Sequence, residues 1–485
     1  MSFKVRRPLL VLATASFWVA LWPRTVPSPL VSDRGTFISV AERLVAGDRL
    51  YVDVWDNKDP LFYYANAVGR LFGPFADLAL EAAWLAVAMV AVGVLARALG
   101  AAPVVRWALV CLATPAVLTG SFYFSGHTHL PGTAVGLAVL AATVRRRYLG
   151  AGVLLGLVAG LKLIAVPVVG VAALVFFLLR REPRGLLLGI AGAALSASGW
   201  LAVLAVRGEL VAYADVLLSN ARYAGADWLQ SSSPSWLAHL ERVWSTNVLA
   251  CLIGVAAALM VGAQALRRPV PTREREPGER DAVALWWATA ASLVAAIGVL
   301  MLTALWQHHA QLLYLPGTLA LVVASARPGN LRRLGAVLSA IVFVGGAWAV
   351  SGGAGPRLYL GAAEQVPVTL GLLASPTPGA EAVLAGGSSG RIARVGTNDA
   401  GTFFGLRAWH LACPRFHQYP FDPPETFAAG VACLPSAEVI VVDAKAVPEP
   451  GEDAWNGYLK DVERLLSERY DCQPVDTGRV CWRRD

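Results

Sequence analysis

A succession of apolar segments, separated by short polar stretches, constrains this chain more than any other feature. They are so extensive that 56% of the residues are hydrophobic and 15% are charged. Soluble domains average roughly 45–50% apolar and about 25% charged residues. Because one soluble core cannot bury this excess, we expect an α-helical polytopic membrane protein with about eleven transmembrane helices. After a first segment at Leu9–Trp22, the apolar segments lie at about 79–96, 107–121, 129–144, 149–161, 164–179, 185–206, 246–266, 283–305, 310–326 and 334–351.

The basic residues between these segments predict how the chain crosses the membrane. If the N-terminus lies in the cytoplasm, the inside stretches hold nineteen Lys and Arg residues and the outside loops hold ten. This bias follows the positive-inside rule, so the net charge of +8 encodes topology rather than nucleic-acid binding. The first segment has signal-peptide length, but no cleavage pattern follows it, and we expect it to remain as a helix. The chain is therefore predicted to be a multi-pass protein of the cell membrane with its C-terminal region outside.

The composition changes near residue 352 to that of a soluble domain. We therefore divide the chain into a membrane domain at about 1–351 and an extracytoplasmic small α/β domain at about 352–485. Short strands are expected at Arg391–Val395 and Glu438–Val442. Helical spacing of apolar residues predicts an amphipathic helix at Asp453–Tyr470.

The six cysteines fall into two classes. Cys111 and Cys251 lie within apolar runs, where cysteine usually behaves as a small hydrophobic residue. The other four have no CxxC spacing, which favours disulfides in an oxidising compartment over a zinc site, with free thiols as the alternative. Three pairings are possible, and the two most local bonds are Cys413–Cys433 and Cys472–Cys481.

The first outer loop, at about 23–78, opens with Asp33 beside Arg34. A carboxylate at the membrane surface can act as a general base, bind a metal or form an ion pair with its neighbour. Further along, Asp53, Asp56 and Asp59 recur every three residues around Lys58, and Pro60 favours a turn or an extended segment over a helix. These three carboxylates suit either a Mg²⁺ or Mn²⁺ site or a hydrogen-bonded loop.

Lys162 interrupts an apolar run that arginine clusters flank on both sides. We expect two short helices that turn at this lysine, near the outer surface of the membrane. A lysine within an apolar run costs several kcal/mol unless it faces a cavity, binds a partner or reaches the interface. An anionic lipid phosphate is one such partner, and extension of the side chain to the interface is the alternative.

Other candidate side chains lie in the later outer loops. His127 and His129 precede one helix, and the pair His308 and His309 precedes another. Such histidines can bind a metal, or they can cap and hydrogen-bond at the interface. Arg222 lies in a further outer loop and can hold a phosphate in a bidentate manner. The sequence has no Walker A, GxGxxG, GxSxG or HExxH pattern, so it gives no support for nucleotide, dinucleotide, serine-hydrolase or zinc-hydrolase chemistry.

Three ordered patterns resemble a known family. Residues 47–64 read GDRLYVDVWDNKDPLFYY, Lys162 follows Gly160-Leu161, and His308-His309 precede Leu312-Leu313-Tyr314-Leu315-Pro316. Over roughly 30–350, the chain resembles the polytopic GT-C glycosyltransferases, in particular the branch of protein O-mannosyltransferases and of transferases that add aminoarabinose to lipid A. Those proteins have a short first helix and a large first outer loop that opens with an acidic motif.

The resemblance implies a polyprenyl-phosphate sugar donor, and a glycan, lipid or protein acceptor. Asp33 would be the general base, and transfer would proceed with inversion. Many relatives have Asp-Glu at the opening motif, so Arg34 here would take the charge-neutralising role of a metal. The implied substrate contacts, to the lipid phosphate or the sugar, are Arg34, Lys58, Tyr63, Lys162, Arg222, His308 and His309.

Two other classes of function fit a polytopic protein. A transporter or flippase of lipid-linked sugars would typically show inverted repeats and broken helices deep in the membrane, and the sequence shows neither. A non-catalytic cell-envelope assembly protein would use the C-terminal domain as its working part. Transfer of a sugar remains the leading hypothesis because bases and phosphate-binding cations are expected at one membrane face.

Overall fold

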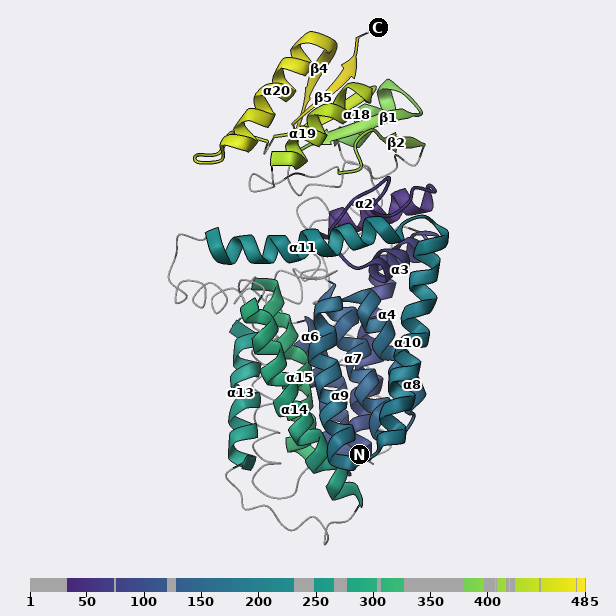
Figure 1. The fold of residues 1–485 in the computed structure, drawn as a ribbon, viewed down its shortest axis with the longest axis vertical. Helices are drawn as coiled ribbons and strands as arrows, with labels where there is room; N and C mark the ends of the chain where they lie inside the picture. Colours follow the sequence, from purple (N-terminus) through teal and green to yellow (C-terminus); the bar gives the residue numbers. More distant parts are fainter. Residues whose placement is uncertain are drawn as a thin grey trace, which may run out of the picture. The chain divides into compact units, whose positions relative to one another are not determined.

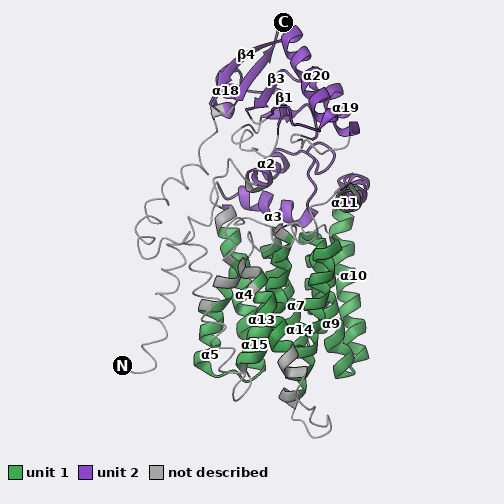
Figure 2. Cartoon of the chain, turned by 90° about the vertical axis from the view of Figure 1, so that its left-hand side faces the viewer, with its two compact units in different colours: residues 1–26, 78–203, 219–366 green, residues 27–77, 204–218, 367–485 purple. Residues whose placement is uncertain are grey.

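The computed structural model describes most of the chain and divides it into two compact units. The helical unit contains residues 1–26, 78–203 and 219–366, and the loop–sheet unit contains 27–77, 204–218 and 367–485 (Figure 2). The described residues are 33–73, 76–119, 128–230, 248–265, 277–302, 307–326, 378–396, 406, 408–415, 418, 424–444, 446–476 and 478–484.

Long apolar helices lie side by side in the helical unit (Figure 1). Four described stretches are long and apolar enough to cross a membrane: Ala79–Ala98, Leu163–Arg180, Pro183–Val206 and Arg280–Leu302. Many of their Leu, Ile and Val side chains are exposed, and surfaces of this size require lipid rather than water around them. The helices are α4 (Ala76–Ala98), α5 (Pro103–Ala108), α6 (Thr114–Thr119), α7 (His129–Val144), α8 (Tyr148–Leu161), α9 (Val166–Arg180), α10 (Pro183–Val206), α13 (Val248–Ala265), α14 (Pro277–Leu302) and α15 (Tyr314–Ala326), with a π-helix at Leu109–Ala113 and 3₁₀ helices at Leu163–Ala165 and Gln307–Leu313.

Nine of the predicted apolar segments overlap helices in the described part of the chain. The segments at Leu9–Trp22 and 334–351 lie outside it, so the predicted total of about eleven spans stays a prediction. Glycines bring two of the helices close together, as is typical within membranes. A Cβ atom at Gly152 of α8 would lie 1.9 Å from the Gly189 oxygen of α10, so no larger residue fits there without a shift.

The predicted interruption at Lys162 is confirmed. Helix α8 ends at Leu161, Lys162 is extended (φ −161°, ψ 88°), and a 3₁₀ turn leads into α9. The chain therefore presents the lysine between two helices rather than within one.

A five-stranded sheet forms the core of the C-terminal part of the loop–sheet unit. Its strand order is β2-β1-β3-β5-β4, in which β2, β1 and β3 are parallel and β5 and β4 are antiparallel. Tyr458, Leu459 and Val462 of one helix pack with Phe427 of another against the sheet residue Ile440. The elements are α18 (Pro378–Gly386), β1 (Gly390–Val395), β2 (Trp409–Leu411), α19 (Pro424–Cys433), β3 (Val439–Asp443), α20 (Asp453–Arg469), β4 (Tyr470–Val475) and β5 (Gly478–Arg483).

These elements agree with the predicted α/β character and with both local disulfides. The two expected strands and the amphipathic helix occur as β1, β3 and α20. Cys413 bonds to Cys433, and Cys472 bonds to Cys481 across the β4–β5 pair. The β4–β5 pair itself was not predicted, because its alternation is weak and most of β4 is exposed.

The first loop contributes two helices to the same unit, α2 (Asp33–Val45) and α3 (Pro60–Arg70). Residues 53–59 between them are not helical, as Pro60 at the first turn of α3 indicated. Helix α11 (Leu210–Gln230) occurs where the sequence predicts an outer loop, and only its first part, up to Leu218, belongs to this unit. The structure therefore groups the first loop with the C-terminal segment, which differs from the division at residue 351.

Candidate functional site

The segment that carries Lys58 is held from both sides by hydrogen bonds. The Lys58 ammonium donates to Asn57 Oδ1 at 2.5 Å, and the Tyr51 hydroxyl donates to the Lys58 carbonyl oxygen at 2.6 Å. Tyr51 adopts a left-handed conformation (φ 66°) that few non-glycine residues take. Burial, followed by the nearby Asp59 and Tyr213, raises the pKa of Tyr51 well above its usual value. The hydroxyl therefore remains a donor, and the half-buried Lys58 has a fixed backbone.

The three aspartates around Lys58 bind three different partners. The exposed Asp53 pairs with Arg49 at 2.9 Å, and this hydrogen bond lowers the pKa of the Asp53 carboxyl group. Asp56 is buried and accepts a hydrogen bond from the Tyr63 hydroxyl. Asp59 accepts one from Tyr213 at 3.3 Å. These contacts match the hydrogen-bonded loop, one of the two alternatives that the spacing left open.

A divalent cation would need several of these oxygens around one point. No group of three or more His, Cys, Asp or Glu side chains is arranged to hold a metal ion in the described part of the chain. The donor set at 53–59 does not fit a Mg²⁺ or Mn²⁺ site, the other alternative for this spacing, because each carboxylate turns to its own donor.

Tyr63 has no exposed surface. Its ring packs against Phe37 and Phe62, with ring centroids 6.0 and 5.7 Å away, and its hydroxyl group bonds to Asp56. This position supports a role in holding Asp56 rather than the direct substrate contact that the resemblance implied.

Glu209 is the central residue of this network, although no sequence pattern predicted it as a site residue. It is completely buried and accepts hydrogen bonds from the Leu50 backbone N–H (2.9 Å), from Arg207 (2.7 Å) and from the Tyr64 hydroxyl. Arg207 also donates to the Asp48 carbonyl oxygen at 3.0 Å. The turn between α10 and α11 is thereby fixed to the first loop. The feature of the sequence that could have identified Glu209 is an acidic residue placed between two apolar stretches.

Two buried ion pairs stabilise the helices that flank the Lys58 segment. Glu42 of α2 pairs with Arg70 of α3 at 2.6 Å, and Arg43 pairs with Asp48 at 2.7 Å. All four side chains are buried, so removing one partner would leave an uncompensated charge inside the protein. The Glu42–Arg70 pair therefore joins α2, whose first residue is Asp33, to α3, and the Arg43–Asp48 pair joins α2 to the loop that follows it.

The C-terminal sheet region contacts the same segment through Trp55. The Trp55 backbone N–H donates to the Pro414 carbonyl oxygen at 2.8 Å, and the Arg415 guanidinium lies 3.7 Å from the centre of the Trp55 ring. Pro414 and Arg415 directly follow Cys413, which the disulfide bonds to Cys433. Residues 414–415, anchored by this disulfide, thus contact Trp55, which lies three residues before Lys58 in the sequence.

Lys162 lies in the helical unit, which also contains His129 and His309. It is 5% exposed, and a Cβ atom on Gly132 of α7 would come within 2.9 Å of its Cβ atom. In the same unit, the rings of His129, at the start of α7, and His309 lie 5.6 Å apart. Carbonyl groups at the end of α8 favour a cation at the position of Lys162.

The remaining predicted residues are placed only by their backbone. Asp33 and Arg34 begin α2, Arg222 lies in α11, and His308 lies in the 3₁₀ helix at Gln307–Leu313. Their side chains, and all of His127, lie outside the described part. Asp33, Arg34, Lys58 and Tyr63 belong to the loop–sheet unit, and Lys162, Arg222, His308 and His309 belong to the helical unit.

Comparisons with known proteins show what this chain is similar to. The pattern of glycosyltransferase family 87 matches residues 62–286, just under half of the chain. The structure of ArnT from Cupriavidus metallidurans bound to undecaprenyl phosphate is similar with a TM-score of 0.54 and 13% identity, covering 99% of this chain and 98% of that one. The cryo-EM structure of the arabinofuranosyltransferase AftD from Mycobacteria gives a TM-score of 0.52 and 16% identity, covering 100% of this chain and 40% of AftD.

No curated protein sequence matches the chain. The likeness to GT-C glycosyltransferases that the sequence predicted is nevertheless confirmed by the family pattern together with the shared fold. The chain has the GT-C fold of a membrane protein, and its central part carries the pattern of a glycosyltransferase family.

Proposed function

We propose that this protein transfers a sugar from a polyprenyl-phosphate donor to an acceptor hydroxyl group on the extracytoplasmic face of the cell membrane. The observation that carries the proposal is the buried Lys162 at the break between α8 and α9. This break lies inside the segment that matches a glycosyltransferase family, in a fold similar to that of ArnT, whose structure was solved with undecaprenyl phosphate.

The reaction is a direct displacement with inversion. Asp33 accepts the proton of the acceptor hydroxyl group as its oxygen forms a bond to the anomeric carbon of the sugar. The bond between that carbon and the phosphate oxygen breaks, and its electron pair leaves with the polyprenyl phosphate. A base at the acceptor and cations at the leaving phosphate are the groups such a transition state requires.

Cations on the chain stabilise the leaving phosphate. Lys58 and Lys162 are the principal phosphate contacts, and Arg222, His308 and His309 assist them. Arg34, next to Asp33, supplies the positive charge that a metal would otherwise supply. Tyr63 contributes indirectly, because it holds Asp56 in the segment of Lys58.

The donor sugar is a pentose or a hexose. AftD is named an arabinofuranosyltransferase, so an arabinose donor is the first to test and a mannose donor the second. The acceptor is a glycan, lipid or protein hydroxyl group. The two disulfides in the C-terminal segment support an extracytoplasmic location, because such bonds persist in oxidising compartments.

The test is transfer of a radiolabelled sugar from polyprenyl phosphate in membranes that contain the protein. We expect Asp33→Asn to abolish transfer and Lys162→Gln to reduce it by at least tenfold. Glu463→Gln is the control, since Glu463 forms an exposed ion pair with Arg479 on the C-terminal sheet domain. Undiminished transfer by Asp33→Asn would refute its role as base. Passage of labelled lipid across the membrane without a glycosidic product would indicate a flippase instead.

A further inference from the structure

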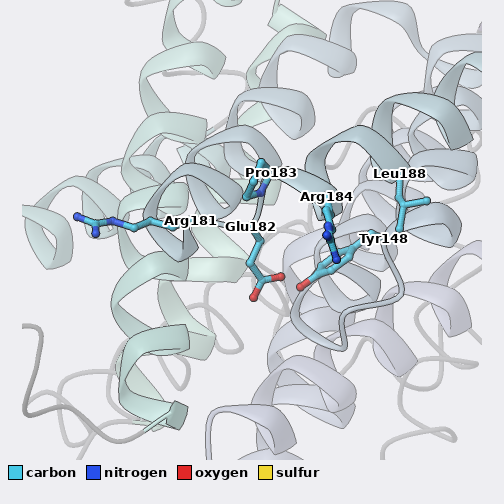
Figure 3. Close-up of a pocket in the computed structure, with 7 residues that line it drawn as sticks. Tyr148, Arg181, Glu182, Pro183, Arg184 and Leu188 are labelled. Carbon is cyan, nitrogen blue, oxygen red and sulfur yellow. The ribbon is translucent and has the colours of Figure 1, made fainter.

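A pocket of about 420 Å³ lies in the helical unit, where α8 begins and the loop between α9 and α10 ends (Figure 3). Its walls include Tyr148, Glu182, Arg184 and Leu188. None of these residues belongs to the candidate site for sugar transfer. The positive-inside pattern places this end of the helices at the cytoplasmic face, opposite the face expected for that site.

The local sequence builds the pocket through one left-handed turn and one missing side chain. Arg181, the residue after α9, has φ 55°, and α10 begins two residues later at Pro183. Gly185 makes room for the Tyr148 ring, because a Cβ atom there would lie 2.9 Å from the ring carbons. The ring also packs edge-on against Phe177, with ring centroids 5.3 Å apart. The Tyr148 side chain is therefore fixed beside the first turn of α10.

The Tyr148 hydroxyl group is the first indication of a ligand. Its oxygen is buried and has no hydrogen-bond partner among the described residues. Buried polar groups in folded proteins are nearly always paired, so an unpaired one indicates a water molecule, an ion or a ligand atom. The first turn of α10 lines the same pocket, and backbone N–H groups at a helix N-terminus favour an anion.

The surrounding charge is positive. Among the described residues of the pocket wall, Glu182 is the only acid, and it already lies 3.9 Å from Arg180 and 4.0 Å from Arg146. Arg184 is exposed and forms no ion pair with the described residues. Arg184 and Tyr148 line the same pocket, and Figure 3 shows Arg181 extending away from both of them. Arg184 is therefore the direct anion contact, and Arg181 adds to the positive potential.

An apolar surface begins at the same place. Leu188, on the pocket wall, is 48% exposed, and the next residues of α10 include Ile190 at 58% and Leu195 at 66%. Only 11% of the most apolar stretch of α10 is buried. A ligand in the pocket would thus contact the cationic Arg184 with one end and the lipid-facing surface of α10 with the other.

We propose that this pocket binds the phosphodiester headgroup of an anionic glycerophospholipid of the cytoplasmic leaflet. The phosphate accepts hydrogen bonds from Arg184 and from the Tyr148 hydroxyl group, and the acyl chains lie along α10. Basic pockets between transmembrane helices on the cytoplasmic side suit such headgroups. The arginine excess favours phosphatidylglycerol over the zwitterionic phosphatidylethanolamine. The inference does not depend on the proposed sugar transfer.

Native mass spectrometry of the full chain, released from detergent with added lipid, tests the site. We expect phosphatidylglycerol to bind at least about tenfold more tightly than phosphatidylethanolamine. Arg184→Gln should reduce the affinity for phosphatidylglycerol about tenfold, because it removes a charge-assisted hydrogen bond. Tyr148→Phe should reduce it several-fold. Arg97→Gln is the matched control, because Arg97 is an exposed arginine in the last turn of α4 and does not line the pocket.

A second measurement separates binding from folding. Tyr148→Phe keeps the ring contacts and removes an unpaired hydroxyl group, so the lipid-free protein should melt at the same temperature as the wild type or slightly higher. Its stabilisation by phosphatidylglycerol should be smaller than that of the wild type. Equal binding of both lipids, an equal loss of affinity in Arg97→Gln, or equal stabilisation by inorganic phosphate alone would overturn the proposal.

Discussion

Replacing Glu209 by alanine should loosen the segment that carries Lys58. Glu209 accepts three hydrogen bonds, from the Leu50 backbone, the Tyr64 hydroxyl group and Arg207. In Glu209→Ala all three donors lose their acceptor. The three donors differ in burial, so they contribute unequally to the stability that Glu209→Ala loses.

The magnitude follows from the environment of each donor. The Leu50 N–H is buried, and leaving it unpaired costs roughly 1–3 kcal/mol. Burial and the hydrogen bond to Glu209 raise the pKa of the half-buried Tyr64, so its hydroxyl group stays protonated and costs about 1 kcal/mol when unpaired. The Arg207 side chain is 35% exposed and can turn to water, which limits its share to less than about 1 kcal/mol. We expect a total near 3 kcal/mol.

Hydrogen exchange of a peptide covering residues 49–55 measures this loss directly. Since about 1.4 kcal/mol corresponds to a factor of ten, protection should fall about a hundredfold. Glu463→Ala makes the same substitution at an exposed ion pair with Arg479 and should change protection in this peptide by less than twofold. If Glu209→Ala lowered protection by less than fivefold, the hydrogen bonds of Glu209 would not hold this segment.

Three further predictions concern the same unit. The Arg49 hydrogen bond lowers the pKa of Asp53, so the pair stabilises the folded state above about pH 4 and loses this effect as the pH falls through the lowered pKa. Solvent screens this exposed pair, so its contribution is small, and Arg49→Gln should remove that part of the acid dependence of the melting temperature. Replacing Cys413 and Cys433 by serine should cost about 3 kcal/mol by the loop-entropy estimate for a separation of 20 residues, measured by urea unfolding against the intact protein. Arg415→Gln removes the cation–π contact with Trp55, worth about 0.5–2 kcal/mol, and should speed exchange of the Trp55 amide more than Arg464→Gln does at an exposed ion pair.

Features that depend on neighbouring residues were predictable from the sequence. Long apolar runs gave the positions of most described helices, because a membrane span is defined by its own composition. The helix break at Lys162 followed from the flanking arginines, and the amphipathic helix α20 followed from the spacing of its apolar residues. Both disulfides joined the cysteines closest in sequence, where the chain can bring the two thiols together with short loops.

Features that depend on distant residues were not predictable. The spacing of Asp53, Asp56 and Asp59 was compatible with a metal site, but the structure gives each a separate donor. One of those donors, Tyr213, lies 154 residues away from Asp59. A segment without strong periodicity also hid α11. Its buried face carries Tyr213 and Val216, whereas Val211 and Leu218 are exposed, so its apolar residues do not mark a single buried side.

The association of the first loop with the C-terminal sheet region is the most distant of these features, and it orders the folding of the Lys58 segment. Arg43 donates to the Leu406 carbonyl oxygen across 363 residues, and Trp55 bonds to Pro414. Neither contact can form until residues beyond 406 have been synthesised, because their acceptors do not yet exist. Cys413 adjoins the second acceptor and is covalently tied to α19. The backbone of the Lys58 segment therefore reaches its final contacts only after the chain has been synthesised as far as Pro414.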